Sequence, residues 1–332
     1  MGWQGCAEEE LVSSTEYASH MLESSWKHSI PRSSGVILKI AFFMMALVLV
    51  AFFAPGHCEA QDRPPEDWVW LGNRALKVGL VRSSGGAIGW ISEAGSDSNL
   101  VNHFDRGRLV QQSWYGSVDG SDWNGKPWRW NPVQGGDWKG KSATILEQKV
   151  TEDSAFIRTR PVHWASGADI EDAIMEQTIS LEDDLLHLKC RFVYSGKIDH
   201  PAHHQEMPAL FVTPELSTLV TYTGTEPWQQ KSVQRSSPGW PNEYRRMTEH
   251  WAAWVDDKDH GLGICVPSAD ELTCYRFGDG NAKRGACSYL APIRTLAVTR
   301  GFDHTWDIWL TIGTSEQIRS RFQKVMGAAD KK

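Results

Sequence analysis

The sequence lacks any block of basic residues, and this absence excludes one large class of partners. The 332-residue chain has 34 lysine and arginine residues against 41 aspartate and glutamate residues, a formal net charge of −7 at pH 7. A chain of that sign without a basic patch is poorly suited to a phosphate backbone, so we expect no nucleic-acid partner.

Several catalytic signatures are also missing. The chain has no GxSxG elbow, no P-loop, no dinucleotide fingerprint and no EF-hand loop. It also lacks the HExxH and CxxC spacings that are typical of zinc sites. These absences exclude nucleotide and phosphoryl-transfer chemistry. We expect no cofactor, although the histidine and carboxylate residues leave a divalent metal open.

One long apolar run stands near the N-terminus, at Val36–Pro55. It is followed by Cys58-Glu59-Ala60, which fits a signal-peptidase site. We therefore expect residues 1–60 to be a leader with a signal peptide, residues 61–68 to be a linker, and the protein to be secreted or periplasmic. The alternative is a retained membrane anchor, because about 20 apolar residues span a bilayer.

Cysteine is scarce beyond this leader, with Cys190, Cys265, Cys274 and Cys287 alone remaining. An even number in an exported chain permits two disulfides. The short separation favours a bond between Cys274 and Cys287, and four buried free thiols are the alternative.

Helical periodicity is scarce too, and alternation with a period of two dominates. In Leu185–Tyr194, every second residue from Leu186 is apolar, which predicts a half-buried antiparallel strand. At the C-terminus, Thr314 and Gln317 form a capping box ahead of an apolar stripe. We predict an all-β fold over residues 69–330, a single large antiparallel β-sandwich with one short C-terminal helix. A propeller is the alternative, although no blade signature repeats.

One stretch, residues 102–138, is too polar for a core and too aromatic for an ordinary surface loop. Its glycines predict a long irregular loop system, and long loops in compact domains are usually functional. Indole faces beside amide, guanidinium and carboxylate groups suit a sugar ring. The expected sugar-binding residues of this stretch are His103, Arg106, Arg108, Gln112, Trp114, Trp128, Trp130 and Trp138.

Arg106 and Arg108 would point the same way if the backbone there were extended. Two guanidinium groups on one face suit a sugar carboxylate or sulfate, so we expect an acidic glycan. The alternative is that both arginines bridge local acids such as Asp105 and Asp137.

A second candidate cluster lies at His203–Glu206. In an extended segment His204 and Glu206 face one way, and an imidazole beside a carboxylate makes an acid/base pair. Metal ligation together with His103 or His200 is one alternative, and a purely structural strand end is the other.

The third cluster is Glu249-His250-Trp251. Glu249 and Trp251 would share one strand face, and a carboxylate beside an indole suits a sugar site. The alternative is that Trp251 belongs to the core and Glu249 caps its edge.

The early hairpin leading into Gly86–Val101 (GAIGWISEAGSDSNLV), the HHQE strand and the EHWAAWV hairpin resemble the galactose-mutarotase-like β-sandwich superfamily. That resemblance implies a carbohydrate-active protein. Aldose epimerases of the superfamily take their His acid and Glu base from separate parts of the sequence. Here His204 and Glu206 are nearly adjacent, so no catalytic role is carried over.

Together these patterns predict an exported enzyme that cleaves a glycosidic bond by general acid/base catalysis. A hydrolase needs two carboxylates, from Glu206 and either Asp105 or Glu249. A polysaccharide lyase is the first alternative, with an arginine or Gln112 neutralising a uronate while His204 and Tyr115 exchange protons. A non-catalytic glycan-binding module and a sugar epimerase are the others.

Overall fold

The computed structural model describes residues 65–229 and 232–329. The expected leader and the first half of the expected linker, residues 61–64, lie outside these residues. Among the described residues, no helix is long and apolar enough to cross a membrane.

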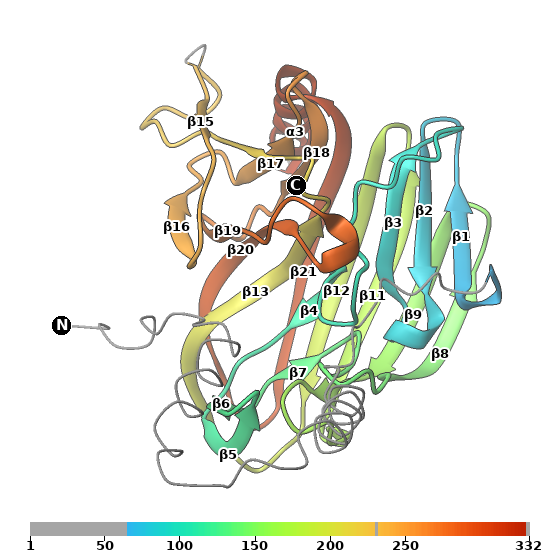
Figure 1. Cartoon of the computed structure of the whole chain (residues 1–332), viewed down its shortest axis with the longest axis vertical. Coiled ribbons are helices and arrows are strands. Elements are labelled where there is room, and N and C mark those ends of the chain that lie inside the picture. Colours follow the sequence, from blue (N-terminus) through green and yellow to red (C-terminus); the bar gives the residue numbers. More distant parts are fainter. Residues whose placement is uncertain (1–64, 230–231, 330–332) are drawn as a thin grey trace, which may run out of the picture. The chain divides into compact units, whose positions relative to one another are not determined.

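Two large antiparallel sheets dominate the described part of the chain (Figure 1). The first sheet runs in the order β1 (Trp68–Gly72), β2 (Leu76–Val81), β3 (Ala87–Glu93), β4 (Val110–Ser113), β13 (His200–Val212), β20 (Cys287–Val298), β19 (Glu271–Phe277) and β16 (Glu243–Arg246). Two short strands attach to it beside β4, namely β7 (Pro132–Val133) and β10 (Val162–His163).

The second sheet runs in the order β15 (Gln234–Ser236), β14 (Thr218–Thr221), β17 (Trp251–Val255), β18 (His260–Cys265), β21 (Phe302–Thr314), β12 (Leu185–Tyr194), β11 (Ala173–Glu182), β9 (Ser154–Arg160) and β8 (Thr144–Val150). A separate hairpin joins β5 (Val118–Trp123) and β6 (Lys126–Arg129). The short 3-10 turns are Pro65–Asp67, Arg82–Ser84 and Ala282–Arg284.

The core lies between the two sheets. Leu80 and Ile88 of the first sheet and Leu188 and Ile264 of the second belong to one buried cluster. The alternation expected in Leu185–Tyr194 is confirmed, because its second, fourth, sixth, eighth and tenth residues are buried. The predicted all-β sandwich with a C-terminal helix is therefore confirmed.

Helix α3 (Ser315–Ala329) packs on the part of the second sheet formed by β17, β18 and β21 (Figure 1). Its Ile318 and Phe322 pack on Trp251, Ala253 and the rest of a second buried cluster. The expected capping box is present: the Thr314 amide donates to Gln317 Oε1 at 2.9 Å, and the Gln317 amide donates to Thr314 Oγ1 at 3.3 Å.

Replacing Thr314 with Ala removes the acceptor for a helix N-terminal amide, so we expect the free energy of unfolding to fall by about 1 kcal/mol. Urea denaturation followed by circular dichroism measures this. Thr299→Ala, at an exposed turn, is the control. Equal midpoints for the two variants would contradict a stabilising cap.

Two sequence expectations are wrong. Residues 102–138 are not one long loop, because β4 is a central strand of the first sheet and β5 pairs with β6. Nor do Cys274 and Cys287 form a disulfide: the four described cysteines are buried free thiols. Cys274 faces the core, whereas Cys287 lies opposite Phe277 on the other face of the sheet.

Candidate functional site

Glu206 lies near the middle of the first sheet, on the face that points away from the core. Along β13, Gln205 and Met207 are buried, whereas Glu206 is half-buried and His204 is exposed, so the expected shared face of His204 and Glu206 is confirmed. Ser113 of β4 and Ile293 of β20 lie opposite Glu206 in the neighbouring strands. A register shift directly after Glu206 is consistent with a β-bulge, a device that re-aims side chains near functional sites.

Hydroxyl groups surround the Glu206 carboxylate. Tyr289 donates a hydrogen bond to Glu206 Oε1 at 2.5 Å, and the hydroxyls of Tyr115 and Ser113 bond the same carboxylate. Burial raises the pKa of Glu206, and the three hydroxyl donors offset only part of that rise. Glu206 therefore holds a proton to a higher pH than an ordinary glutamate does, as a general acid requires.

The two tyrosines cannot easily serve as bases. Burial and the nearby Glu206 charge raise the pKa of both Tyr115 and Tyr289 well above the usual value. Each hydroxyl therefore stays protonated near neutral pH, so it acts as a hydrogen-bond donor.

A second carboxylate, Asp105, lies on the turn that precedes β4. It accepts hydrogen bonds from the amides of Gly107 and Arg108, each at 2.9 Å, and forms an ion pair with the Arg108 guanidinium. Arg108 Nη2 also donates to the Gly285 carbonyl at 3.0 Å. The Asp105 side chain keeps 28% of its surface exposed, so a ligand can reach it.

Gln111 fixes this turn to the sheet. Its side-chain amide donates to the carbonyls of Arg106, Gly107 and Arg108 at 2.8 to 2.9 Å. Its side-chain oxygen accepts from the Gly135 amide at 2.6 Å. Such a network preorganises the turn and the Asp105 carboxylate that it carries.

Tyr275 of β19 lies opposite Tyr289 of β20, on the face of the sheet that carries Glu206. Burial raises the pKa of Tyr275, and the charges of Cys287, Glu206 and Asp105 add to the rise, whereas Arg108 opposes it. Its ring centroid lies 4.6 Å from that of Tyr289. The candidate site thus comprises the carboxyl groups of Glu206 and Asp105, the Arg108 guanidinium, and the rings of Tyr275 and Tyr289.

Several other predicted residues lie elsewhere. Because the chain turns at Asp105, Arg106 points away from Arg108 and donates to the carbonyls of Ser83 and Gly140. The two guanidinium groups therefore do not share a face. His103 contacts Asn99 and the ring of Trp68. It is not part of the group formed by Glu206 and its hydroxyl donors Ser113, Tyr115 and Tyr289, which we call the Glu206 cluster.

Most aromatic side chains of residues 110–138 pack against other residues of the protein, because these residues form strands and a hairpin. Trp114 is fully buried and stacks on Phe192 at 4.4 Å, and Gln112 is buried with its amide bonded to the Glu176 carbonyl. The other three tryptophans predicted to bind sugar pack on neighbouring residues: Trp128 contacts Trp123, Trp130 stacks on His200, and Trp138 donates to the Ala165 carbonyl.

Trp251 begins β17 of the second sheet beneath α3, but Glu249 lies in the turn before that strand, so the two do not share a strand face as expected. Glu249 is fully buried and accepts hydrogen bonds from Arg319, from the Trp228 amide and from Trp251 Nε1. Trp251 is core, as the structural alternative held. Neither residue lies near the Glu206 cluster, which leaves Asp105 as the second acid.

The sequence pattern did not single out Ser113, Tyr275 or Tyr289. Tyr289, Ala291 and Ile293 alternate along β20 and would predict one shared face, but only the pairing with β13 places that face over Glu206. Among the described residues, no group of three or more His, Cys, Asp or Glu side chains is positioned to hold a metal ion.

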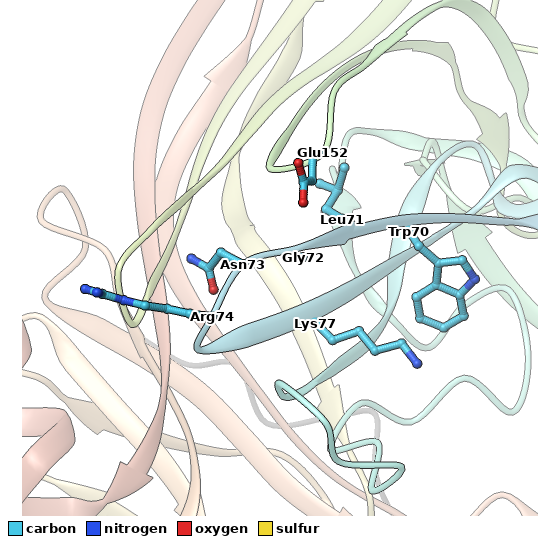
Figure 2. Close-up of a pocket in the computed structure, with 7 residues that line it drawn as sticks. All are labelled: Trp70, Leu71, Gly72, Asn73, Arg74, Lys77 and Glu152. Carbon is cyan, nitrogen blue, oxygen red and sulfur yellow. The ribbon is translucent and has the colours of Figure 1, made fainter.

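An open hollow at the turn between β1 and β2 offers a competing location (Figure 2). Its lining has one carboxylate, Glu152, and the Lys77 ammonium lies 4.5 Å from the centre of the Trp70 ring. Arg74 reaches outward to Asp183. No pair of acids meets there, so the hollow is a weaker candidate for acid/base chemistry.

Comparison with known proteins agrees with this architecture. No known family model and no curated protein matches the sequence. A structure from Escherichia coli K12, described as an aldose 1-epimerase, is 12% identical with a TM-score of 0.51 and covers 74% of this chain and 99% of its own. A galactose mutarotase-like protein from Lactobacillus casei is 10% identical with a TM-score of 0.48, covering 74% and 100%.

At 12% identity the similarity to the Escherichia coli structure establishes the fold alone. The chain has the galactose-mutarotase-like β-sandwich fold, and the predicted resemblance is confirmed at that level.

Proposed function

We propose that this chain is a carbohydrate-active enzyme that cleaves a glycosidic bond, with Glu206 as the proton donor. The observation that carries the proposal is the half-buried Glu206, whose raised pKa keeps a proton available beneath a ring of tyrosines. The structural relative described as an aldose 1-epimerase supports a sugar ligand.

The step needs a second group, and Asp105 supplies it. Glu206 gives its proton to the glycosidic oxygen as the bond from that oxygen to the anomeric carbon breaks. Asp105, which forms an ion pair with Arg108, accepts a proton from the water that attacks the anomeric carbon.

We also propose that the glycan is acidic. Only Arg108 supports this, because the Arg106 guanidinium bonds the Ser83 carbonyl and does not lie beside Arg108. A lyase is less well supported, since the raised pKa values of Tyr115 and Tyr289 oppose a tyrosine base. Export is also proposed, supported by the apolar run and the Cys58-Glu59-Ala60 pattern.

A panel of neutral and uronate-containing polysaccharides tests this function. The purified chain is expected to generate new reducing ends from one of them, without the ultraviolet absorbance of an unsaturated sugar. Absorbance at equal yield would establish a lyase instead. Anomer interconversion without cleavage would indicate an epimerase, and binding without any product would indicate a binding module.

Replacing Tyr289 with Phe is expected to move the alkaline limb of the kcat/KM profile to higher pH. Activity needs protonated Glu206, so it falls as the pH rises through the pKa of that group. Tyr289 lowers this pKa by donating to the carboxylate, so its loss raises the pKa further. Initial rates across pH measure the limb. Tyr194→Phe, whose hydroxyl bonds the Ile198 carbonyl, is the control and leaves the limb in place. A shift to lower pH would contradict Glu206 as the acid.

A further inference from the structure

Three exposed aromatic side chains and the half-buried Tyr275 border Glu206 and its hydroxyl donors, and we call Trp240, Tyr244, Tyr275 and Phe277 the aromatic wall. Trp240 is 60% exposed, Tyr244 51% and Phe277 41%. The wall lies at the edge of the first sheet formed by β16 and β19 (Figure 1). Exposed aromatic rings in such a cluster indicate a binding surface.

The wall is continuous with the candidate site. The Trp240 ring centroid lies 4.8 Å from that of Tyr275, with an angle of 85° between the planes. The Tyr244 ring lies 5.6 Å from the ring of His204, two residues from Glu206. The indole therefore meets Tyr275 edge to face, and most of its surface remains in solvent.

Hydrogen bonds fix the segment that carries Trp240. Asn242 Nδ2 donates to Thr273 Oγ1 of β19 at 2.9 Å, and the Gly239 amide donates to Glu243 Oε1 at 3.0 Å. Glu243 also forms an ion pair with Arg245. A rigid aromatic ring is an efficient anchor, because little side-chain entropy is lost when a ligand stacks on it.

Trp70 shows the contrast. It is 41% exposed on the same sheet, but its ring stacks on Trp68 at 5.2 Å and 18°, and Lys77 lies over it at 4.5 Å. Protein groups already occupy the stacking positions around Trp70, whereas no such stacked ring accompanies Trp240 among the described residues.

We infer that Trp240 forms a second sugar subsite, so that the substrate is a chain of at least two sugar units. One unit sits over Glu206, Tyr289 and Tyr275, and the next stacks its C–H face on the Trp240 indole. This inference rests on the proposed function for the identity of the first unit, but the stacking itself does not need turnover.

The test uses a glycan array of neutral and uronate-containing saccharides of one to six units, followed by calorimetric titration with the tightest oligosaccharide. We compare the wild-type chain with Trp240→Ala and with Trp70→Ala. Trp240→Ala is expected to weaken oligosaccharide binding about tenfold while monosaccharide binding is unchanged, and Trp70→Ala to leave both unchanged. Trp240→Phe should recover part of the affinity.

Equal oligosaccharide affinity for the wild-type chain and Trp240→Ala would overturn the subsite, as would the absence of oligosaccharide binding by the wild-type chain. The proposed function fails separately. If oligosaccharide binding depends on Trp240 but no glycan is cleaved, the subsite stands and the proposed enzymatic function fails. If a glycan is cleaved and Trp240→Ala changes neither binding nor cleavage, the function stands and the subsite fails.

Discussion

Replacing Glu206 with Gln is expected to lower kcat/KM by about 10²- to 10⁴-fold, the usual contribution of a general acid. The amide can still accept a hydrogen bond from Tyr289, so the packing of the site is preserved. What the variant loses is the proton that leaves with the glycosidic oxygen. Initial rates of reducing-end release, measured on the glycan identified by the panel, give the ratio.

Glu271→Gln provides the matched control for this variant. Glu271 lies on β19 of the same sheet, opposite Ile293, and makes no contact with the Glu206 carboxylate. We expect its activity to match that of the wild-type chain. If Glu206→Gln retains more than about a tenth of the activity with an unchanged unfolding midpoint, Glu206 is not the acid.

Replacing Glu249 with Ala is expected to lower the free energy of unfolding by about 3–5 kcal/mol, because the change leaves the Arg319 charge without its partner in a buried setting. The Glu249 side chain is fully buried, and that of Arg319 is 19% exposed. The Trp228 amide and Trp251 Nε1 lose their acceptor as well. Urea denaturation measures the loss, with Glu316→Gln in the exposed first turn of α3 as the control.

A double-mutant cycle with Arg319→Met separates the ion pair from the other two hydrogen bonds. The double variant should be more stable than Glu249→Ala alone, because the half-buried guanidinium that had faced the Glu249 carboxylate is gone as well. Activity per folded molecule should stay at the wild-type level in both. If the Glu249→Ala variant is fully folded but inactive, Glu249 has a catalytic role after all.

The fold was largely predictable from periodicity. Leu185–Tyr194 alternates because one of its faces lies in the core, and that alternation is visible without any partner strand. The capping box at Thr314 is equally local, since both of its hydrogen bonds join residues three apart. Features of this kind can be predicted from a short stretch of sequence, because all the residues that form them lie within it.

Residues 102–138 show where local reading fails. The polar run Gln111-Gln112-Ser113 does not look like a central strand, yet β4 lies between β3 and β13. The side-chain amide nitrogen of Gln112 donates to a carbonyl of the opposite sheet, and that of Gln111 donates to the carbonyls of the Asp105 turn. Polar side chains can occupy a central strand when tertiary partners satisfy them, and those partners are distant in sequence.

The candidate site divides in the same way. Glu206 and His204 were predictable as a shared face, because alternation along one strand determines it. Tyr289 and Tyr275 were not, because β13 pairs with β20, which begins 75 residues after β13 ends. Tryptophan abundance was misleading for Trp114, whose large apolar ring stabilises the core more than it could serve a ligand.

A structure of the Glu206→Gln chain bound to the oligosaccharide that it fails to cleave tests the central claim most directly. The account predicts a sugar ring against Tyr289 and Tyr275, with its glycosidic oxygen within hydrogen-bond distance of residue 206. A sugar bound instead in the hollow at Trp70 and Lys77, with the face of Glu206 unoccupied, would contradict it.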